Sequence, residues 1–228
     1  MIRPIVNVPL NLMRMAQVNW DIDWRGQPSA ERSDGSTQVV NNAFPRWVGS
    51  PRVVLNSGQL AQWRAIRWQA QGRLGIYRVF MVDPHVFNRR AHDVQGSAEA
   101  GLPFLTGERF DTGSGFLRAP FVEASKKASA GDTVVTVKVP DDLHMPRVGQ
   151  ILSHDDWPFG VVGVTPTTGQ KVELDIQMPL RADIPKDDPV HLLASGLFEV
   201  PDASAGNPDY GALPVSRPQL AFREVLNR

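Results

Sequence analysis

The sequence predicts a mainly β protein: an N-terminal β-sandwich or barrel-like domain with one α-helix, interrupted by a small antiparallel β-barrel domain. Short apolar runs recur along the 228 residues and are separated by turn residues. Nineteen glycines and nineteen prolines are spread through the chain, which is typical of many turns between short strands. One stretch has apolar side chains at helical spacing. With 42% apolar residues the chain can bury a core.

The first expected strand spans 13–24, where apolar and polar residues alternate. This period indicates a half-buried strand with a polar outer face. Its inward face would consist of Val18, Trp20, Ile22 and Trp24. Asp21 and Asp23 fall on the outer face, where we expect solvation and not the carboxylate pair of a glycoside hydrolase. The next strands are expected at 37–40 and 46–55, with a break at Pro51.

The helix is predicted to follow Asn56 and Ser57, which can cap its N-terminus, and to stop at Gly72. Its buried stripe is formed by Leu60, Trp63, Ile66 and Ala70. A strand over 76–82 follows, so the helix should pack on a sheet. Such a scaffold supplies no catalytic chemistry.

Trp68 lies off the buried stripe of the predicted helix. It either widens the buried face or lies at a contact with another subunit. Arg64 and Arg67 lie beside it, and tryptophan and arginine are enriched at the cores of protein interfaces. We therefore take Arg64, Arg67 and Trp68 as candidate subunit-interface residues.

The segment 85–117 is rich in glycine and predicts a long connection without strands of its own. Such segments are usually functional loops or linkers. Arg89 and Arg90 make it a candidate docking arm in the subunit interface, and the alternative is a solvated crossover between domains.

A second set of short strands with glycine turns runs over 119–193 and predicts the small barrel. The chain continues with expected strands at 196–201 and 219–226, the second with Leu220, Phe222 and Glu224 on one face. These pieces are too small to fold alone. We therefore predict one domain from 1–118 plus 194–228, and an inserted domain at 119–193.

Composition excludes several classes of partner and chemistry. The 24 basic and 24 acidic side chains balance, so the chain lacks the basic excess that drives nucleic-acid binding. It has no cysteine, hence no disulfide, thiolate metal site or cysteine nucleophile. No apolar run approaches the roughly 18 residues of a membrane span. The N-terminus lacks a signal-type apolar core, so we expect synthesis in the cytoplasm.

No catalytic, cofactor-binding or metal-binding residue is predicted. His154, Asp155 and Asp156, with His144 ten residues earlier, match no usual zinc spacing, and a turn explains them. The run 113–115 (Gly-Ser-Gly) lacks the frame of a serine-hydrolase elbow, and no lysine follows it as in a phosphate loop. Ser125 beside Lys126 is only superficially a nucleophile pair. We therefore expect a protein that is not an enzyme.

A succession of segments carries a resemblance over most of the chain. After the alternating N-terminal strand come FPRWVGSPRVVL, LAQWRAIRWQAQGRLGIYRVFMVDP, GLPFLTGERFDTGSGF, ASAGDTVVTVKV, VGQILS, MPLRADIP, GLFEV and a late strand. In this order they resemble the distal tail proteins of long-tailed (siphovirus-type) bacteriophages and of related prophage or gene-transfer particles.

The resemblance implies a structural virion protein at the phage tail tip. It implies a homo-oligomeric ring, a hexamer, that joins the tail tube protein to the tail hub or baseplate. In that family an N-terminal β domain with one helix builds the ring, and a β-barrel domain is peripheral. The barrel is galectin-like or of oligosaccharide-binding type in some relatives. Two alternatives stay open: a carbohydrate-binding β module that recognises a host surface, with Trp157 as the stacking residue, and a cell-wall hydrolase.

Overall fold

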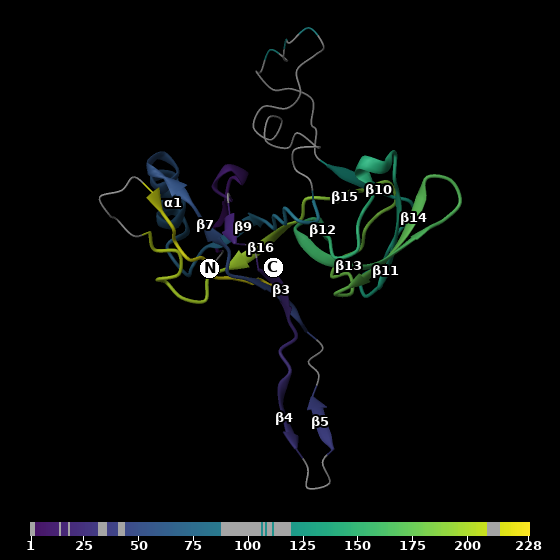
Figure 1. Cartoon of the computed structure of the whole chain (residues 1–228), viewed down its shortest axis with the longest axis horizontal. Helices are drawn as coiled ribbons and strands as arrows, with labels where there is room; N and C mark the ends of the chain where they lie inside the picture. Colours follow the sequence, from purple (N-terminus) through teal and green to yellow (C-terminus); the bar gives the residue numbers. More distant parts are fainter. Residues whose placement is uncertain are drawn as a thin grey trace. The chain divides into compact units, whose positions relative to one another are not determined.

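The computed structural model describes residues 3–13, 15–17, 19–31, 36–40, 44–87, 106, 108, 111, 120–208 and 215–228. Within these residues the chain is mainly β, with α1 (Ser57–Ala70) as its single α-helix (Figure 1). Two 3₁₀ turns, η1 (Leu10–Leu12) and η2 (Asp142–His144), complete the helical elements. The predicted fold class is confirmed: one helix, a larger sheet and a closed antiparallel barrel.

The larger sheet has the strand order β1-β9-β16-β18-β6-β3. Its strands are β1 (Ile5–Asn7), β3 (Trp20–Asp23), β6 (Arg46–Gly49), β9 (Ile76–Phe80), β16 (Ser195–Glu199) and β18 (Phe222–Glu224). Three two-stranded ladders accompany it: β2 (Met15–Gln17) with β7 (Arg52–Val53), β4 (Gln27–Glu31) with β5 (Thr37–Val40), and β8 (Leu55–Asn56) with β17 (Val215–Ser216).

Six antiparallel strands close the barrel in the order β10-β11-β14-β13-β12-β15 (Figure 1). They are β10 (Phe121–Ala124), β11 (Val134–Lys138), β12 (Ile151–His154), β13 (Trp157–Pro166), β14 (Lys171–Gln177) and β15 (Pro189–His191). Alternating residues fill its interior, including Val135, Val137, Leu152, Leu174, Ile176 and Val190. Asp155 and Asp156 turn the chain between β12 and β13 with φ of 46° and 61°. This pair of positive φ angles is that of a tight hairpin turn, as predicted for these residues.

The chain divides into two compact units. Unit 1 comprises Met1–Ile5, Met15–Ile76 and Phe198–Arg228, and unit 2 comprises Val6–Arg14 and Tyr77–Leu197. All six barrel strands lie inside the predicted insertion 119–193 and belong to unit 2. The boundaries expected at 118 and 194 stay a prediction.

The helix begins and ends as its sequence predicts. Asn56 accepts a hydrogen bond from the Gln59 backbone N–H at 3.0 Å, and the Gln59 side chain accepts one from the Asn56 N–H at 3.1 Å. This reciprocal capping box satisfies two donors that the helix itself leaves unpaired. At the other end Gln71 and Gly72 adopt left-handed φ values of 52° and 65°, which terminates the helix.

Aromatic side chains form the core of unit 1 next to β3. The Trp20 ring lies 5.1 Å from Phe198 and 6.1 Å from Phe222 between centroids. A Cβ at Gly49 would stand 2.3 Å from the Trp20 ring, so β6 needs glycine opposite this tryptophan. Leu220, Phe222 and Glu224 are buried together, as the alternation of 219–226 predicts. The Glu224 carboxylate accepts a hydrogen bond from the Trp47 backbone N–H at 3.0 Å.

Two expectations for 13–24 are wrong. The stretch forms two strands, because β2 pairs with β7 whereas β3 pairs with β6. Trp24 is also not in the core but 46% exposed. The cause is local: the Arg25 N–H donates to the Asp23 carboxylate at 2.9 Å, and Arg25 adopts a φ of 51°, so the chain leaves the strand direction after Asp23. Val18, expected beside them, lies outside the described residues.

Candidate subunit-interface surface

The outer side of α1 carries the candidate interface residues. Trp63, Ile66 and Ala70 are buried, which confirms most of the predicted stripe, and Leu60 is half-buried. Trp68 is 68% exposed, so the alternative in which it widens the buried face of α1 is wrong. Arg64 and Arg67 are half-buried at the border of this exposed side.

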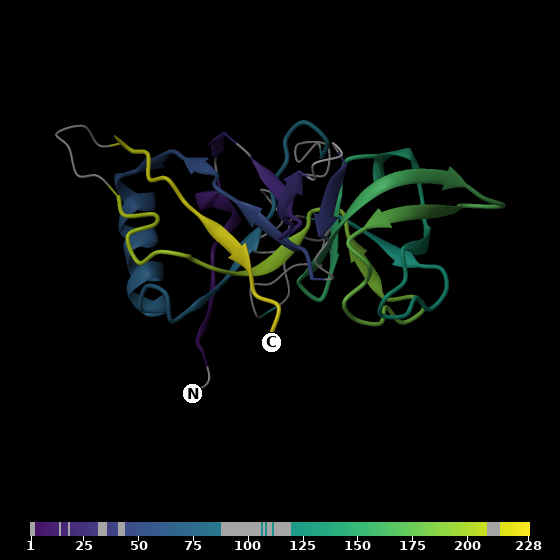
Figure 2. The ribbon, with the colours of Figure 1, turned by 90° about the horizontal axis from the view of Figure 1, so that it is seen from below.

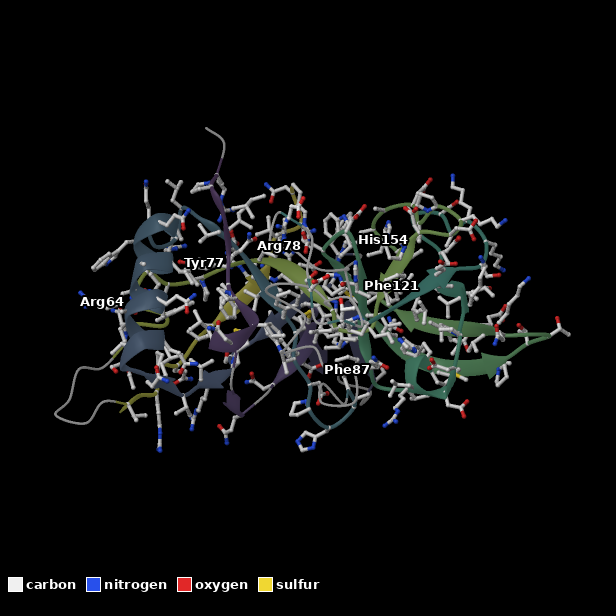
Figure 3. The ribbon with its side chains drawn as sticks, turned by 90° about the horizontal axis from the view of Figure 1, so that it is seen from above. Arg64, Tyr77, Arg78, Phe87, Phe121 and His154 are labelled. Carbon is white, nitrogen blue, oxygen red and sulfur yellow. The ribbon has the colours of Figure 1, made fainter. Side chains whose placement is uncertain are left out.

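Arg64 and Trp68 form a pair one helical turn apart. The Arg64 guanidinium carbon lies 4.8 Å from the centre of the Trp68 ring, and Figure 3 shows Arg64 on the outside of α1. A cation over an indole face at this distance is attracted by the ring quadrupole, by about 0.5–1 kcal/mol at exposed sites. The pair therefore holds a large apolar ring and a positive charge together at the surface.

The loop after β16 completes the surface. Arg67 donates from Nη2 to the Ala203 carbonyl at 2.8 Å, and the loop lies against α1 (Figure 2). A hollow of about 280 Å³ is lined by Arg64, Arg67, Trp68, Asn207 and Pro208. These five residues are called the α1 surface below. It combines two guanidinium groups, an indole and an amide, and α1 itself carries no acidic side chain.

Sequence reading did not find the contribution of the loop to this surface. The Trp63 Nε1–H donates to the Gly206 carbonyl at 2.8 Å, and this bond ties the loop to the buried face of the helix. Gly206 has a φ of +76°, which favours glycine. From the sequence, the run 202–218 is predicted only as a polar loop rich in glycine and proline. The glycine itself was the available signal, but it does not identify Trp63 as the partner of this loop.

Cationic side chains are distributed unequally by type. Unit 1 has eleven arginines and no lysine, whereas all five lysines lie between Lys126 and Lys186 in the segment that forms the barrel. Protein interfaces are enriched in arginine and depleted in lysine. Arginine loses less side-chain conformational entropy for each hydrogen bond that it forms, because its guanidinium group is planar and rigid. The distribution favours unit 1 as the part that contacts other proteins.

Arg89 and Arg90 lie outside the described residues, as do most of the predicted docking arm and the run 113–115. Their role in an interface stays a prediction.

The histidine and aspartate residues near the barrel turn are held by other protein groups. Asp156 accepts from Arg78 Nε at 2.8 Å and from the Ser195 hydroxyl at 2.8 Å. His154 is buried, and its Nδ1 lies 3.0 Å from the Pro189 carbonyl oxygen. Burial and, next, the neighbouring His154 lower the pKa of His191. His144 instead pairs with Asp141 at 2.7 Å. The described residues contain no group of three such side chains arranged for a metal.

Trp157 lies beside a small cavity of the barrel. It is half-buried, and the Arg181 guanidinium carbon lies 5.9 Å from the ring centre. The cavity at this place is about 10 Å³ and is lined by Trp157, Arg181 and the buried His154, among others. That volume is about enough for one water molecule. The carbohydrate-binding alternative stays a prediction.

The described part of the chain includes no helix with the length and apolar character needed to cross a membrane. Comparison with known proteins gives no family for the chain: it matches no model of a known protein family, and no curated protein matches it in sequence.

Proposed function

We propose that this chain is a structural, non-enzymatic protein of a bacteriophage tail tip. Copies of it form a closed ring, a hexamer, that joins the tail tube protein to the tail hub or baseplate. It is made in the cytoplasm of the host bacterium and resides in the virion. The proposal combines the segment-by-segment resemblance of the sequence with one structural observation: the exposed Trp68, held under Arg64, on a helix whose other side is buried.

A ring places a defined demand on a subunit. Each copy meets its neighbour through two different patches, because a head-to-tail contact repeated by rotation closes the ring. The patches must bury aromatic and arginine side chains in enough area to hold without covalent links. The α1 surface has the composition of such a patch. Unit 1 contains arginine but no lysine, which also supports an interface in this unit.

Cryo-electron microscopy of the purified protein, with mass photometry over a range of concentrations, tests the proposal. We expect closed rings of uniform copy number, and the same ring between tube and hub in images of intact tails. A chain that remains monomeric at high micromolar concentration and is absent from tails would contradict it. Activity on peptidoglycan or micromolar binding on a glycan array would instead favour the alternative functions.

A further inference from the structure

The α1 surface needs a complementary patch if rings form head to tail, and unit 1 contains a second exposed aromatic site. Trp24 follows β3 directly and is 46% exposed, and Phe44 precedes β6 and is 63% exposed. The register of the two strands pairs Asp23 with Arg46, so Trp24 and Phe44 lie at the same end of this ladder. The two rings make this end of the ladder an exposed apolar site.

Carboxylates accompany this pair. Asp21 is exposed on β3, which is the edge strand of the six-stranded sheet. Its Oδ1 accepts the Ile22 backbone N–H at 2.7 Å, and no ion pair to Asp21 occurs among the described residues. Asp23 is instead bound to Arg46 at 3.2 Å. Asp21, Trp24 and Phe44 are called the β3 patch below.

Among the described residues β3 pairs with β6, and Asp21 blocks one backbone donor on the outer edge of β3. An edge strand exposes unpaired backbone groups that can template aggregation, and native proteins block such edges. At β3 the Asp21 carboxylate occupies the Ile22 N–H, and the Asp23 carboxylate occupies the Arg25 N–H. These two carboxylates therefore make pairing with a further strand less favourable at this edge.

We infer that the α1 surface of one copy docks on the β3 patch of a second copy. The inference rests on the proposed ring and names the two faces of its interface. Chemistry matches them: guanidinium groups of Arg64 and Arg67 meet the Asp21 carboxylate, while the Trp68 ring meets Trp24 and Phe44. Both patches belong to unit 1, and Figures 1 and 2 show α1 and β3 on different sides of it, as a head-to-tail contact requires.

Charge reversal with mixing tests the inference. Variant A carries Arg64→Glu and Arg67→Glu, and variant B carries Asp21→Lys. Each variant alone sets like charges against each other, so we expect its ring-forming concentration to rise roughly 100-fold or more. In an equimolar mixture both contacts are again complementary: the reversed α1 surface of A meets the reversed β3 patch of B, and the native faces meet at the other contact. We expect rings to return, with A and B in equal number by native mass spectrometry.

Two matched controls separate this effect from net charge. Arg52→Glu with Arg217→Glu changes two exposed arginines of unit 1 outside both patches, and Asp142→Lys changes an exposed aspartate of the barrel segment. We expect the controls to form rings at the wild-type concentration. Rings of A alone or B alone at that concentration, or a mixture that assembles no better than its components, would overturn the inference.

Photo-crosslinking gives an independent reading of the partner. A benzophenone amino acid replaces Trp68 in a chain labelled with ¹⁵N and mixed with unlabelled copies. We expect crosslinks between copies that map to 19–25 or 44–50. Crosslinks to the barrel segment, or to a different protein in assembled tails, would overturn the proposed pairing while the ring itself stands. A wild-type chain without rings would instead remove the proposed function and the inference together.

Discussion

Truncation of Trp68 tests the interface with a magnitude that the structure supplies. A tryptophan side chain can bury about 150–250 Å², and 68% of Trp68 is exposed in the single chain. Covering that surface at about 25 cal/mol per Å² would contribute about 3–4 kcal/mol to each contact. Alanine values of about 2–4 kcal/mol are typical of tryptophan anchors at interfaces. We therefore expect Trp68→Ala to weaken each contact between copies by about 30- to 1000-fold, since 1.4 kcal/mol is tenfold.

The same change should leave the monomer folded. The side chain is 68% exposed, so its loss removes the attraction to Arg64, about 0.5–1 kcal/mol at an exposed site, and only the contacts of its smaller covered part. Alanine also favours the helix, which offsets part of that loss. Mass photometry gives the ring-forming concentration, and urea unfolding gives the stability of the monomer. Leu143→Ala, an exposed apolar truncation on η2, is the control. If Trp68→Ala rings form at the wild-type concentration, the assignment of the α1 surface is refuted.

Three further predictions concern the folded chain. Gly206→Ala should destabilise unit 1 by about 2–4 kcal/mol in urea unfolding, because φ is +76° and the new Cβ would lie 2.8 Å from Leu220 and 3.0 Å from Trp63; a loss below 0.5 kcal/mol would contradict this reason. Asp156→Asn keeps a residue that tolerates positive φ but removes the charge that binds Arg78, which is 41% exposed, so we expect a loss of about 1 kcal/mol by the same measurement. Because the pKa of His191 is lowered in the folded chain, the unfolded chain takes up a proton on this histidine at a higher pH than the folded chain does. The contribution of His191 to the free energy of unfolding is therefore complete above pH 6.5, the ordinary value, and is lost as the pH drops below it. His191→Gln should flatten this slope between pH 7.5 and 5, and an unchanged slope would assign it to other groups.

The free energy of unfolding of unit 1 should also fall in acid through a second group, Glu199, at a lower pH than the effect of His191. Burial opposes ionisation of Glu199, but hydrogen bonds from Arg223 and Arg3 outweigh it, and the pKa of this carboxyl is lowered. The Arg3 guanidinium also donates to the Leu74 carbonyl at 2.8 Å. Because the stabilising form is the ionised one, this contribution is present above the ordinary pKa and lost as the pH falls through the folded value. The ion pair between Arg3 and Glu199 therefore stabilises unit 1 at neutral pH and not in strong acid.

The sequence predicted correctly those helices and strands that are determined by residues within a single stretch of the chain. The capping residue Asn56, the stop at Gly72 and the apolar spacing from Trp63 to Ala70 all lie within one stretch, and the helix formed there as predicted. Barrel strands such as β14 were predicted because alternation and glycine turns repeat within a few residues. Burial of Glu224 followed from alternation alone, although its partner, the Trp47 N–H, is 177 residues away.

Features that depend on distant partners could not be predicted in this way. Alternation over 13–24 gave no sign that β2 and β3 pair with different strands. The turn that exposes Trp24 depends on one side-chain bond from Asp23. The α1 surface is completed by a loop that is held by the hydrogen bond from Trp63 to Gly206, two residues that lie 143 positions apart in the sequence. The nearness of Trp24 and Phe44 appears only once the register of β3 and β6 is known.

The exposed aromatic residues are explained better by assembly than by the stability of a single chain. Within unit 1 the Trp20 ring packs against Phe198 and Phe222, and Trp63 donates a hydrogen bond to Gly206. The pairing of Trp68 with Arg64 contributes about 1 kcal/mol at most, whereas covering the exposed part of the ring would contribute several times more. A ring requires two different patches on each copy, and unit 1 has two exposed aromatic sites, one accompanied by arginines and one by a carboxylate. The proposed ring would account for both sites with one contact, repeated around the ring.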